Sequence, residues 1–232
     1  MPPVADHVRP PEVPSDLSVR SAPAVLDGGS VGAAGSGRLG DLSAQALGCT
    51  RCRLSATRTQ VVFGSGDPDA DLMFVGEAPG AQEDEQGVPF VGRSGQLLDR
   101  LVSEEMGLSR NDSYIANVVK CRPPENRDPL PDEIEACRPW LEAQIDLIEP
   151  KVIVTLGNFS SKLLLDTKVG ITKLRGVAYP YRQLSEGGSV QVVPTFHPAA
   201  VLRGGAQPMA RVREDLGVAA QILAVPAERS AS

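Results

Sequence analysis

The chain has 232 residues, of which 41% are hydrophobic and 22% are charged, and its formal net charge is −6. This length suits one domain, or one domain with a tail, and the composition is ordinary for a soluble globular protein. Because no apolar run approaches the roughly 20 residues of a membrane-spanning helix, and the N-terminus has no basic and apolar signal regions, we expect a cytoplasmic protein without membrane association.

The first segment of the chain, residues 1–40, contains 22 Pro, Gly, Ala or Ser residues. It shows no helical or strand period, and it would bury too little apolar surface to offset the entropy lost on ordering. We therefore predict a flexible tail at 1–40, a folded domain at 41–225 and a short C-terminal tail at 226–232.

Within the folded segment, short apolar runs alternate with helical patterns. The runs predicted as strands are 72–76, 114–119, 152–156 and 190–195. The segments predicted as helices are 41–47, 94–106, 131–148, 158–165 and 210–223. This alternation predicts an α/β fold: a single three-layer α/β/α domain around a central, mainly parallel, four-stranded sheet.

The chain has four cysteines, a C-x2-C pair at Cys49 and Cys52 and a wider pair at Cys121 and Cys137. Structural disulfides are disfavoured in a reducing cytosol, and a redox role for the first pair would leave the second unused. Four thiolates suit a tetrahedral zinc ion or an iron–sulfur cluster. Spacing alone leaves a cluster, zinc and no metal open, although zinc ribbons usually pair two tight knuckles.

The chemically interesting segments lie at the ends of the predicted strands. Gly76 and Glu77 end the first strand, Asn117 lies late in the second, Gly157 follows the third, and His197 follows the fourth. In open α/β sheets the ligand crevice lies outside the carboxyl ends of the strands. We therefore expect these residues to meet at one edge of the sheet.

Three blocks of sequence lie at that edge: 76–99, which includes GEAPGAQED, GVPFVG and GQLLD; 117–124, NVVKCRPP; and 195–203, TFHPAAVLR. Together they resemble the signature blocks of the family 4 uracil-DNA glycosylases. The resemblance covers about residues 41–216, and all four cysteines stand where that family places its [4Fe–4S] ligands. It implies a monofunctional enzyme that flips uracil out of DNA and hydrolyses its N-glycosidic bond, leaving an abasic site.

The resemblance also implies a set of site residues, with Glu77 and His197 catalytic and uracil held by Gly76, Glu77, Glu83, Phe90, Asn117 and His197. The residue types suit this task. Phe90 can stack on a pyrimidine, and the Asn117 amide can accept from uracil N3–H while donating to O4, a pattern that cytosine reverses. A hydrogen bond from His197 would stabilise the negative charge that develops on the departing uracil.

Two acidic residues of the first block have separate expected roles. Glu77 would orient the attacking water and stabilise positive charge on the sugar. Glu83 lies on the same loop, and we expect it to crowd the C5 position of the base and so exclude thymine.

Charge is unevenly distributed along the chain. Residues 41–150 have a net charge of −10, whereas residues 151–213 carry nine basic and two acidic groups, a net charge of +7. We expect phosphate contacts mainly from the basic segment and binding that weakens with salt. The loop after His197 would enter the duplex with apolar wedges. Its DNA-binding candidates are Val201, Leu202 and Arg203.

Three alternatives remain, two within the same superfamily and one in another class. A covalently trapping member of the superfamily needs a histidine in a basic insertion, and 117–129 contains none. Broader-specificity relatives have an apolar residue at the position of Glu77. A non-catalytic iron–sulfur protein that binds DNA or senses redox state would share the cysteines without needing the uracil site. We expect a monomer with a [4Fe–4S] cofactor that acts on uracil-containing DNA.

Overall fold

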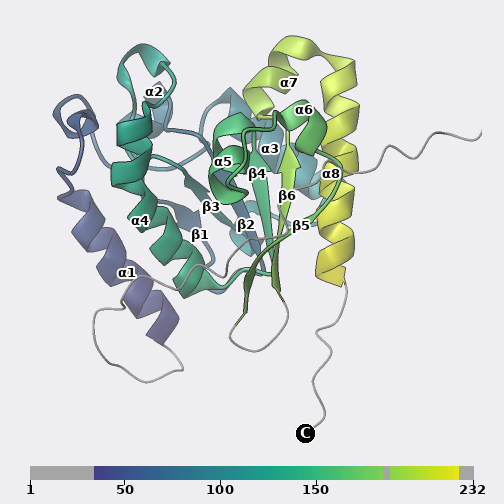
Figure 1. Ribbon diagram of the computed structural model, residues 1–232, viewed down its shortest axis with the longest axis horizontal. Coiled ribbons are helices and arrows are strands. Elements are labelled where there is room, and N and C mark those ends of the chain that lie inside the picture. Colours follow the sequence, from purple (N-terminus) through teal and green to yellow (C-terminus); the bar gives the residue numbers. More distant parts are fainter. Residues whose placement is uncertain (1–33, 185–188, 225–232) are drawn as a thin grey trace, which may run out of the picture.

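The computed structural model describes residues 34–184 and 189–224 (Figure 1). A six-stranded sheet lies at its centre, in the order β1-β3-β2-β4-β6-β5. The four inner strands pair in parallel: β2 (Leu72–Gly76), β3 (Tyr114–Asn117), β4 (Val152–Leu156) and β6 (Ser189–Thr195). These are the four strands predicted from the apolar runs, so the α/β class and the mainly parallel sheet are confirmed.

Two antiparallel edge strands extend the sheet beyond the four predicted. They are β1 (Ser65–Gly66) and β5 (Tyr179–Gln183). A two-residue strand leaves no pattern in the sequence, and β5 contains Pro180, beside which its register shifts. Proline is tolerated in edge strands because no neighbouring strand needs its missing N–H group.

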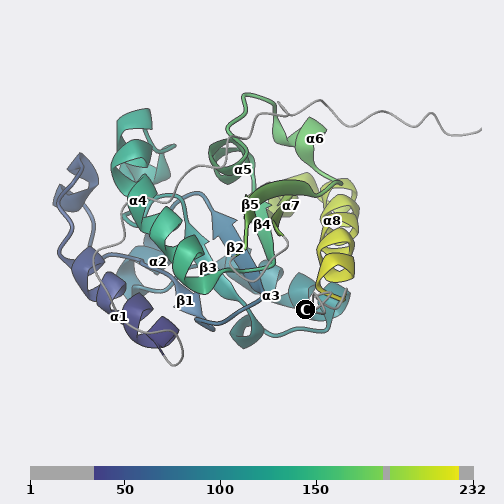
Figure 2. The same ribbon diagram turned by 60° about the horizontal axis from the view of Figure 1, so that its bottom comes forward.

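Helices cover both faces of the sheet (Figure 2). One face packs against α1 (Ala34–Leu47), α4 (Pro131–Ile148), α5 (Asn158–Leu164) and α6 (Ile171–Leu174). The other face packs against α3 (Arg93–Met106), α7 (Pro198–Gly204) and α8 (Ala206–Ala224). The remaining helical segments are α2 (Ala81–Gln86) and the single-turn η1 (Arg53–Ala56), η2 (Arg110–Asp112) and η3 (Pro124–Asn126). The predicted three-layer architecture is thus present.

Strand β2 shows why the layers form. Leu72 and Phe74 point into the core beneath α3 and α8, whereas Met73 and Val75 point into the core beneath α4. Side chains alternate between the faces of a strand, and a strand covered on both faces reads as one continuous apolar run.

The described helices differ from the predicted ones mainly at their ends. Helix α1 begins at Ala34, so 34–40, predicted as part of the tail, are helical. The rest of the predicted N-terminal tail and the predicted C-terminal tail lie outside the described residues. Helix α3 ends at Met106, and Gly107, with a φ of 66°, forms the left-handed cap expected there. None of the described helices is long and apolar enough to cross a membrane.

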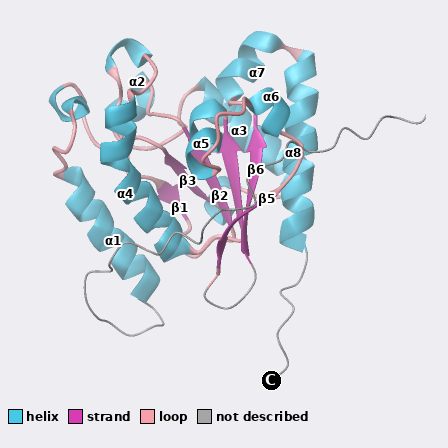
Figure 3. Ribbon diagram, viewed as in Figure 1, coloured by secondary structure: helices cyan, strands magenta, loops and turns pink. Residues whose placement is uncertain are grey.

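Strand register brings the functional segments level with one another. Gly76 pairs with Asn117 across β2 and β3, and Leu156 pairs with Thr195 across β4 and β6. The carboxyl ends of these strands point toward the end of the molecule where α2 and α7 lie (Figure 3). Glu77, Asn117 and His197 therefore meet at one edge, as the sequence predicted.

Candidate active site

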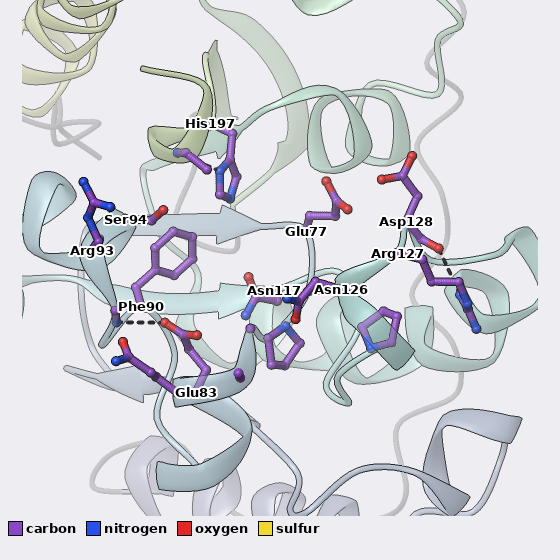
Figure 4. Close-up of a pocket in the computed structure, with 18 of the residues that line it drawn as sticks. Glu77, Glu83, Phe90, Arg93, Ser94, Asn117, Asn126, Arg127, Asp128 and His197 are labelled. Atoms are coloured by element: carbon purple, nitrogen blue, oxygen red, sulfur yellow. Dashed lines mark hydrogen bonds between the residues drawn. The ribbon is translucent and has the colours of Figure 1, made fainter. Parts of the chain in front are cut away.

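A pocket of about 680 Å³ opens at the carboxyl ends of the strands (Figure 4). Most of the predicted site residues line it: Glu77, Glu83, Phe90, Asn117, His197 and Arg203. They come from the loop after β2, the end of β3 and the loop after β6. The structure therefore brings together residues that lie up to 126 positions apart in the sequence, from Glu77 to Arg203.

Gly76 lies where two of these side chains approach the backbone. A Cβ atom at this position would be 2.4 Å from Asn117 Oδ1 and 2.6 Å from Phe90 Cζ. No side chain larger than hydrogen fits there without displacing one of them. Gly76 therefore allows the aromatic ring and the amide to meet above the end of β2.

Phe90 is fixed in a left-handed backbone conformation, with φ at 53°. Glu83 Oε1 accepts hydrogen bonds from the N–H groups of Val91, at 3.0 Å, and Gly92, at 2.9 Å. On the other side, Arg110 Nη1 donates to the Phe90 carbonyl oxygen at 2.9 Å. A non-glycine residue in this region is strained and persists only where its surroundings hold it. Glu83 thus fixes the loop, while its expected role against thymine stays a prediction.

Asn117 is 1% exposed, and its Oδ1 atom has no hydrogen-bond partner among the described residues. Its main-chain carbonyl oxygen accepts a hydrogen bond from the buried Lys120 Nζ at 2.8 Å. Buried polar side-chain atoms are usually paired, and leaving one unpaired costs about 1–3 kcal/mol. The amide therefore has an acceptor available for a donor that enters the pocket.

His197 follows β6 and faces Phe90, with the ring centroids 5.8 Å apart. Burial, reinforced by the positive charge of Arg203, lowers the pKa of His197 to about 4, although Glu83 acts in the opposite direction. The ring is therefore neutral near pH 7. Its Nδ1 accepts a hydrogen bond from the Ala199 N–H at 3.1 Å, so the single proton of the neutral ring is on Nε2.

His197 also depends on a close backbone approach. A Cβ atom at Gly157, which follows β4, would lie 3.2 Å from His197 Cβ, and Gly157 has a φ of 99°. A side chain there would be strained and would crowd the histidine. The Gly157 position, singled out as a strand end in the sequence, thus acts on the site through its lack of a side chain.

Glu77 faces a second carboxylate across the pocket, that of Asp128 (Figure 4). Burial, and to a lesser extent the negative charge of Asp128, raises the pKa of Glu77 to about 7. The carboxyl group of Glu77 therefore titrates near neutral pH, where a group that handles a water proton is most effective.

The loop between Cys121 and Cys137 forms one wall of the pocket, although none of its residues was expected there from the sequence. Its lining residues are Pro123, Asn126, Arg127 and Asp128. The fully buried Glu133 holds this loop, since its carboxylate accepts from Arg127 at 2.6 and 2.9 Å and from the Leu130 N–H at 2.8 Å. The sequence did contain a signal for this wall of the pocket. The loop is polar, it follows the end of the strand that carries Asn117, and it lies between two cysteines of the ligand type.

Helix α7 corrects one of the proposed wedge residues. Val201 is 1% exposed and packs in the core with α3 and α8, so it cannot enter a duplex without unpacking that core. Leu202 is 44% exposed and stays available as the apolar wedge. Arg203 lines the pocket. The sequence did not separate these neighbours because both are aliphatic, and only the position of α7 decides which one is buried.

Comparison with known proteins shows the family of this chain. The model of the uracil DNA glycosylase superfamily matches residues 63–217. The chain belongs to this superfamily. A type-4 uracil-DNA glycosylase of Sulfurisphaera tokodaii is 50% identical over 163 residues, which covers 68% of this chain and 73% of the relative. Another, of Saccharolobus solfataricus, is 49% identical over 158 residues, or 66% and 72% of the two chains. A third, of Thermotoga maritima, is 48% identical over 165 residues, or 71% and 83%. The resemblance to family 4 is thereby confirmed.

The four cysteines of this superfamily member line one small pocket together with residues of α1 and α4. All four are free thiols. Arg58 Nη1 lies 3.3 Å from Cys121 Sγ, and the Lys120 N–H lies 3.2 Å from Cys137 Sγ. Burial raises the pKa of Cys137 to about 11 and raises that of Cys121. As placed, the described residues include no group of three or more ligand-type side chains gathered around one point as metal ligands.

Much of the positive charge of residues 151–213 is paired with acidic side chains of the same chain. Four of the nine basic residues in this segment form salt bridges with acidic side chains, namely Lys151 with Asp71, Arg175 with Glu214 and Asp215, Arg182 with Asp146, and Arg213 with Glu104 and Glu105. The net charge of +7 read from the sequence therefore overstates the positive charge that this segment offers to DNA.

Proposed function

We propose that this protein is a uracil-DNA glycosylase that hydrolyses the bond between uracil and deoxyribose in DNA. Its membership of the superfamily and its similarity to type-4 enzymes support the activity. The observation that carries the residue assignment is the buried Asn117 Oδ1 atom, which has no partner within the described residues and lies in a pocket with Phe90 and His197.

Recognition of uracil follows from the Asn117 amide. Its oxygen accepts from N3–H, and its nitrogen donates to O4, while Phe90 stacks on the base. Cytosine presents an acceptor at N3 and a donor at C4, so it would leave these buried groups unpaired. Sites that read a base by buried hydrogen bonds discriminate strongly for this reason.

His197 and Glu77 act on the two sides of the scissile bond. The neutral His197 ring donates its Nε2–H toward uracil O2 and stabilises the charge that develops as the bond breaks. The Glu77 carboxylate orients a water toward C1′. In the reaction the water oxygen bonds to C1′, the C1′–N1 bond breaks with its electrons on uracil, and a water proton passes to Glu77.

The direct test uses an oligonucleotide with one uracil, incubated with the protein and then treated with alkali to break abasic sites. We expect cleavage at uracil and none in a matched thymine oligonucleotide. Glu77→Gln and His197→Ala should lose activity, whereas Glu135→Gln, which changes an exposed carboxylate on α4, should retain it. Binding of uracil-containing DNA without any cleavage would instead support the non-catalytic alternative.

A second test addresses the choice of base. Asn117→Asp replaces the donor to O4 with a carboxylate, so we expect slower uracil excision or acceptance of cytosine. Excision from paired uracil and cytosine oligonucleotides measures both effects. Unchanged rate and selectivity would remove Asn117 from the site.

We further propose that the four cysteines hold a [4Fe–4S] cluster. Three features of their pocket suit such a group. The four thiols line it together, Arg58 and the Lys120 N–H already point at sulfur atoms, and Trp140 Nε1 is buried there without a partner among the described residues. Cationic groups and N–H donors around the sulfurs stabilise the negative charge of a thiolate-ligated cluster.

The cluster, when bound, would fix the ends of the loop that carries Asp128 to the pocket. We expect a brown protein with broad visible absorbance and about four iron atoms per chain by elemental analysis. A colourless protein with one zinc atom would overturn the cluster assignment. Size-exclusion chromatography tests the expected monomer.

A further inference from the structure

A second hollow, of about 340 Å³, lies beside the pocket. We call it the α3 groove. Its lining residues are Arg93, Gln96, Leu97 and Arg100 from α3 and Leu202 from α7. Arg93 also lines the main pocket, and Arg203, the neighbour of Leu202, lines that pocket as well. The groove and the pocket therefore form one continuous surface.

The two arginines of the groove lie on one side of their helix. Arg93 and Arg100 are seven residues apart, which is two helical turns, or about 10 Å along the helix axis. Both residues are exposed. Gln96 lies between them and adds an amide donor to the same surface.

The charges of both arginines are available to a ligand. Arg93 forms no salt bridge within the described part of the chain. Arg100 pairs with Glu104 at 3.8 Å, and both side chains are largely exposed, so this pair contributes little. By contrast, Arg213, from the segment that the sequence marked as basic, is held by Glu104 and Glu105. The accessible positive charge next to the pocket thus includes α3, inside the part of the chain that is acidic overall.

We propose that the α3 groove binds the sugar–phosphate backbone beside the flipped nucleotide, with Arg93 and Arg100 contacting different phosphates of one strand. This inference rests on the proposed function. The two arginines are about 10 Å apart along the axis of α3, so a strand that lies in the groove can contact each of them with a different phosphate group. Leu202 lines the groove beside them and is exposed, which suits an apolar side chain that enters the neighbouring base step.

Continuity with the pocket favours DNA over an acidic peptide as the occupant. A strand that delivers a base to the main pocket must leave it in both directions, and the groove opens from the pocket at Arg93. An acidic peptide would not place a base in the main pocket, so the continuity of groove and pocket would not be needed for its binding.

The test measures binding of a duplex that carries a non-cleavable abasic-site analogue, at several salt concentrations, for wild type, Arg93→Gln, Arg100→Gln and Lys151→Gln. Lys151 is the matched control because it loses the same charge at the start of β4, at the opposite end of the strands, where it pairs with Asp71. For Arg93→Gln and Arg100→Gln we expect the slope of log K against log salt to be less steep than that of wild type by about 0.9. The ratio of the wild-type binding constant to that of each variant should then decrease about 3.5-fold between 50 and 200 mM salt.

The length of the substrate gives a second readout. Arg100→Gln should weaken binding of the duplex but not of a trinucleotide with a central uracil, because the trinucleotide does not reach Arg100. If Arg100→Gln and Lys151→Gln have equal slopes on the duplex, the groove proposal is wrong, and it is also wrong if the Arg100→Gln penalty persists on the trinucleotide.

These outcomes are separate from those of the proposed function. Excision of uracil by wild type together with equal slopes for Arg100→Gln and Lys151→Gln would overturn the groove and leave the activity intact. Absence of excision by wild type would overturn the proposed activity, whatever the slopes.

Discussion

Arg110 holds Phe90 from behind: its Nη1 donates to the Phe90 carbonyl oxygen at 2.9 Å, and its Nη2 donates to the carbonyl oxygen of Pro89. Asp99 orients the same guanidinium at 3.2 Å. Phe90 is in a left-handed conformation that costs of order 1–3 kcal/mol. Arg110 thus supports the aromatic platform of the pocket although it does not line the pocket itself.

We therefore expect Arg110→Met to release the Phe90 loop and to raise KM for a uracil-containing duplex by about tenfold, with a smaller effect on kcat. A hydrogen bond to a charged group contributes about 1.5–3 kcal/mol, which is the origin of this magnitude. Arg110→Lys should recover part of the loss because the lysine keeps the charge and N–H donors but lacks the planar fork that bonds both carbonyl groups. Steady-state kinetics measures both variants.

The control for this prediction is Arg138→Met, which removes an arginine that pairs with Glu135 on the surface of α4. Its kinetics should match those of wild type. Equal KM values for Arg110→Met and wild type would show that the loop keeps its conformation without Arg110.

Asp128 should set the pH dependence of excision through Glu77. Since Glu77 acts as a carboxylate, activity should rise as pH increases through its pKa of about 7. Asp128→Asn removes a neighbouring negative charge, which makes ionisation of Glu77 easier and lowers its pKa. We expect the acid limb of kcat/KM to move to lower pH by up to about one unit, while burial keeps the pKa above its ordinary value.

His197 does not interfere with this measurement, because its pKa of about 4 lies below the acid limb. Asp132→Asn is the matched control, since Asp132 is exposed near the same loop and pairs with Arg53. An acid limb that stays in place in Asp128→Asn, with full activity, would contradict the coupling between the two carboxylates.

Ionised Glu77 should also lower the free energy of unfolding near and above pH 7, where the carboxylate acts in the reaction. Its pKa is raised in the folded state, so ionisation of Glu77 opposes folding above the pKa of the unfolded chain, and this effect is complete above about pH 7. Because the group is partly exposed, we discount the full linkage and expect Glu77→Gln to gain about 1–2 kcal/mol at pH 8.

That gain corresponds to a rise of about 2–8 °C in Tm. The difference from wild type should become small near pH 4, where Glu77 is mostly protonated in both states. Thermal unfolding at the two pH values measures it, with Glu135→Gln as the exposed control. If the difference in Tm between Glu77→Gln and wild type is no larger at pH 8 than at pH 4, the burial argument is refuted.

The sequence was most informative for the site residues that the parallel sheet positions. Glu77, Asn117 and His197 each follow or end an apolar run, and parallel strands place such ends at one edge whatever the intervening helices do. Arg110 and Asp128 were not predicted to act at the site because neither ends a strand. Arg110 reaches Phe90 through a single-turn helix, and Asp128 reaches Glu77 through a loop fixed by the buried Glu133, contacts that no local pattern encodes. Val201 shows the same limit, since its burial depends on how α7 packs.

Trp140 offers a direct reading of the cysteine pocket. It is the only tryptophan in the chain, it lines this pocket with the four cysteines, and Arg51 lies over its ring at 4.6 Å. A bound iron–sulfur cluster absorbs broadly and would quench its emission. We expect weak tryptophan fluorescence in the brown protein and a clear rise when iron is removed with a chelator and reductant.

The Trp140 N–H, which has no partner in the described part of the chain, makes a second expectation possible. If it donates to a sulfur atom of the bound cluster, Trp140→Phe should lower the reduction potential, because lost hydrogen bonds to sulfur disfavour the more negative reduced state. Voltammetry of the two proteins measures this shift. Strong fluorescence in an iron-loaded protein, or identical potentials for wild type and Trp140→Phe, would place Trp140 away from the cluster.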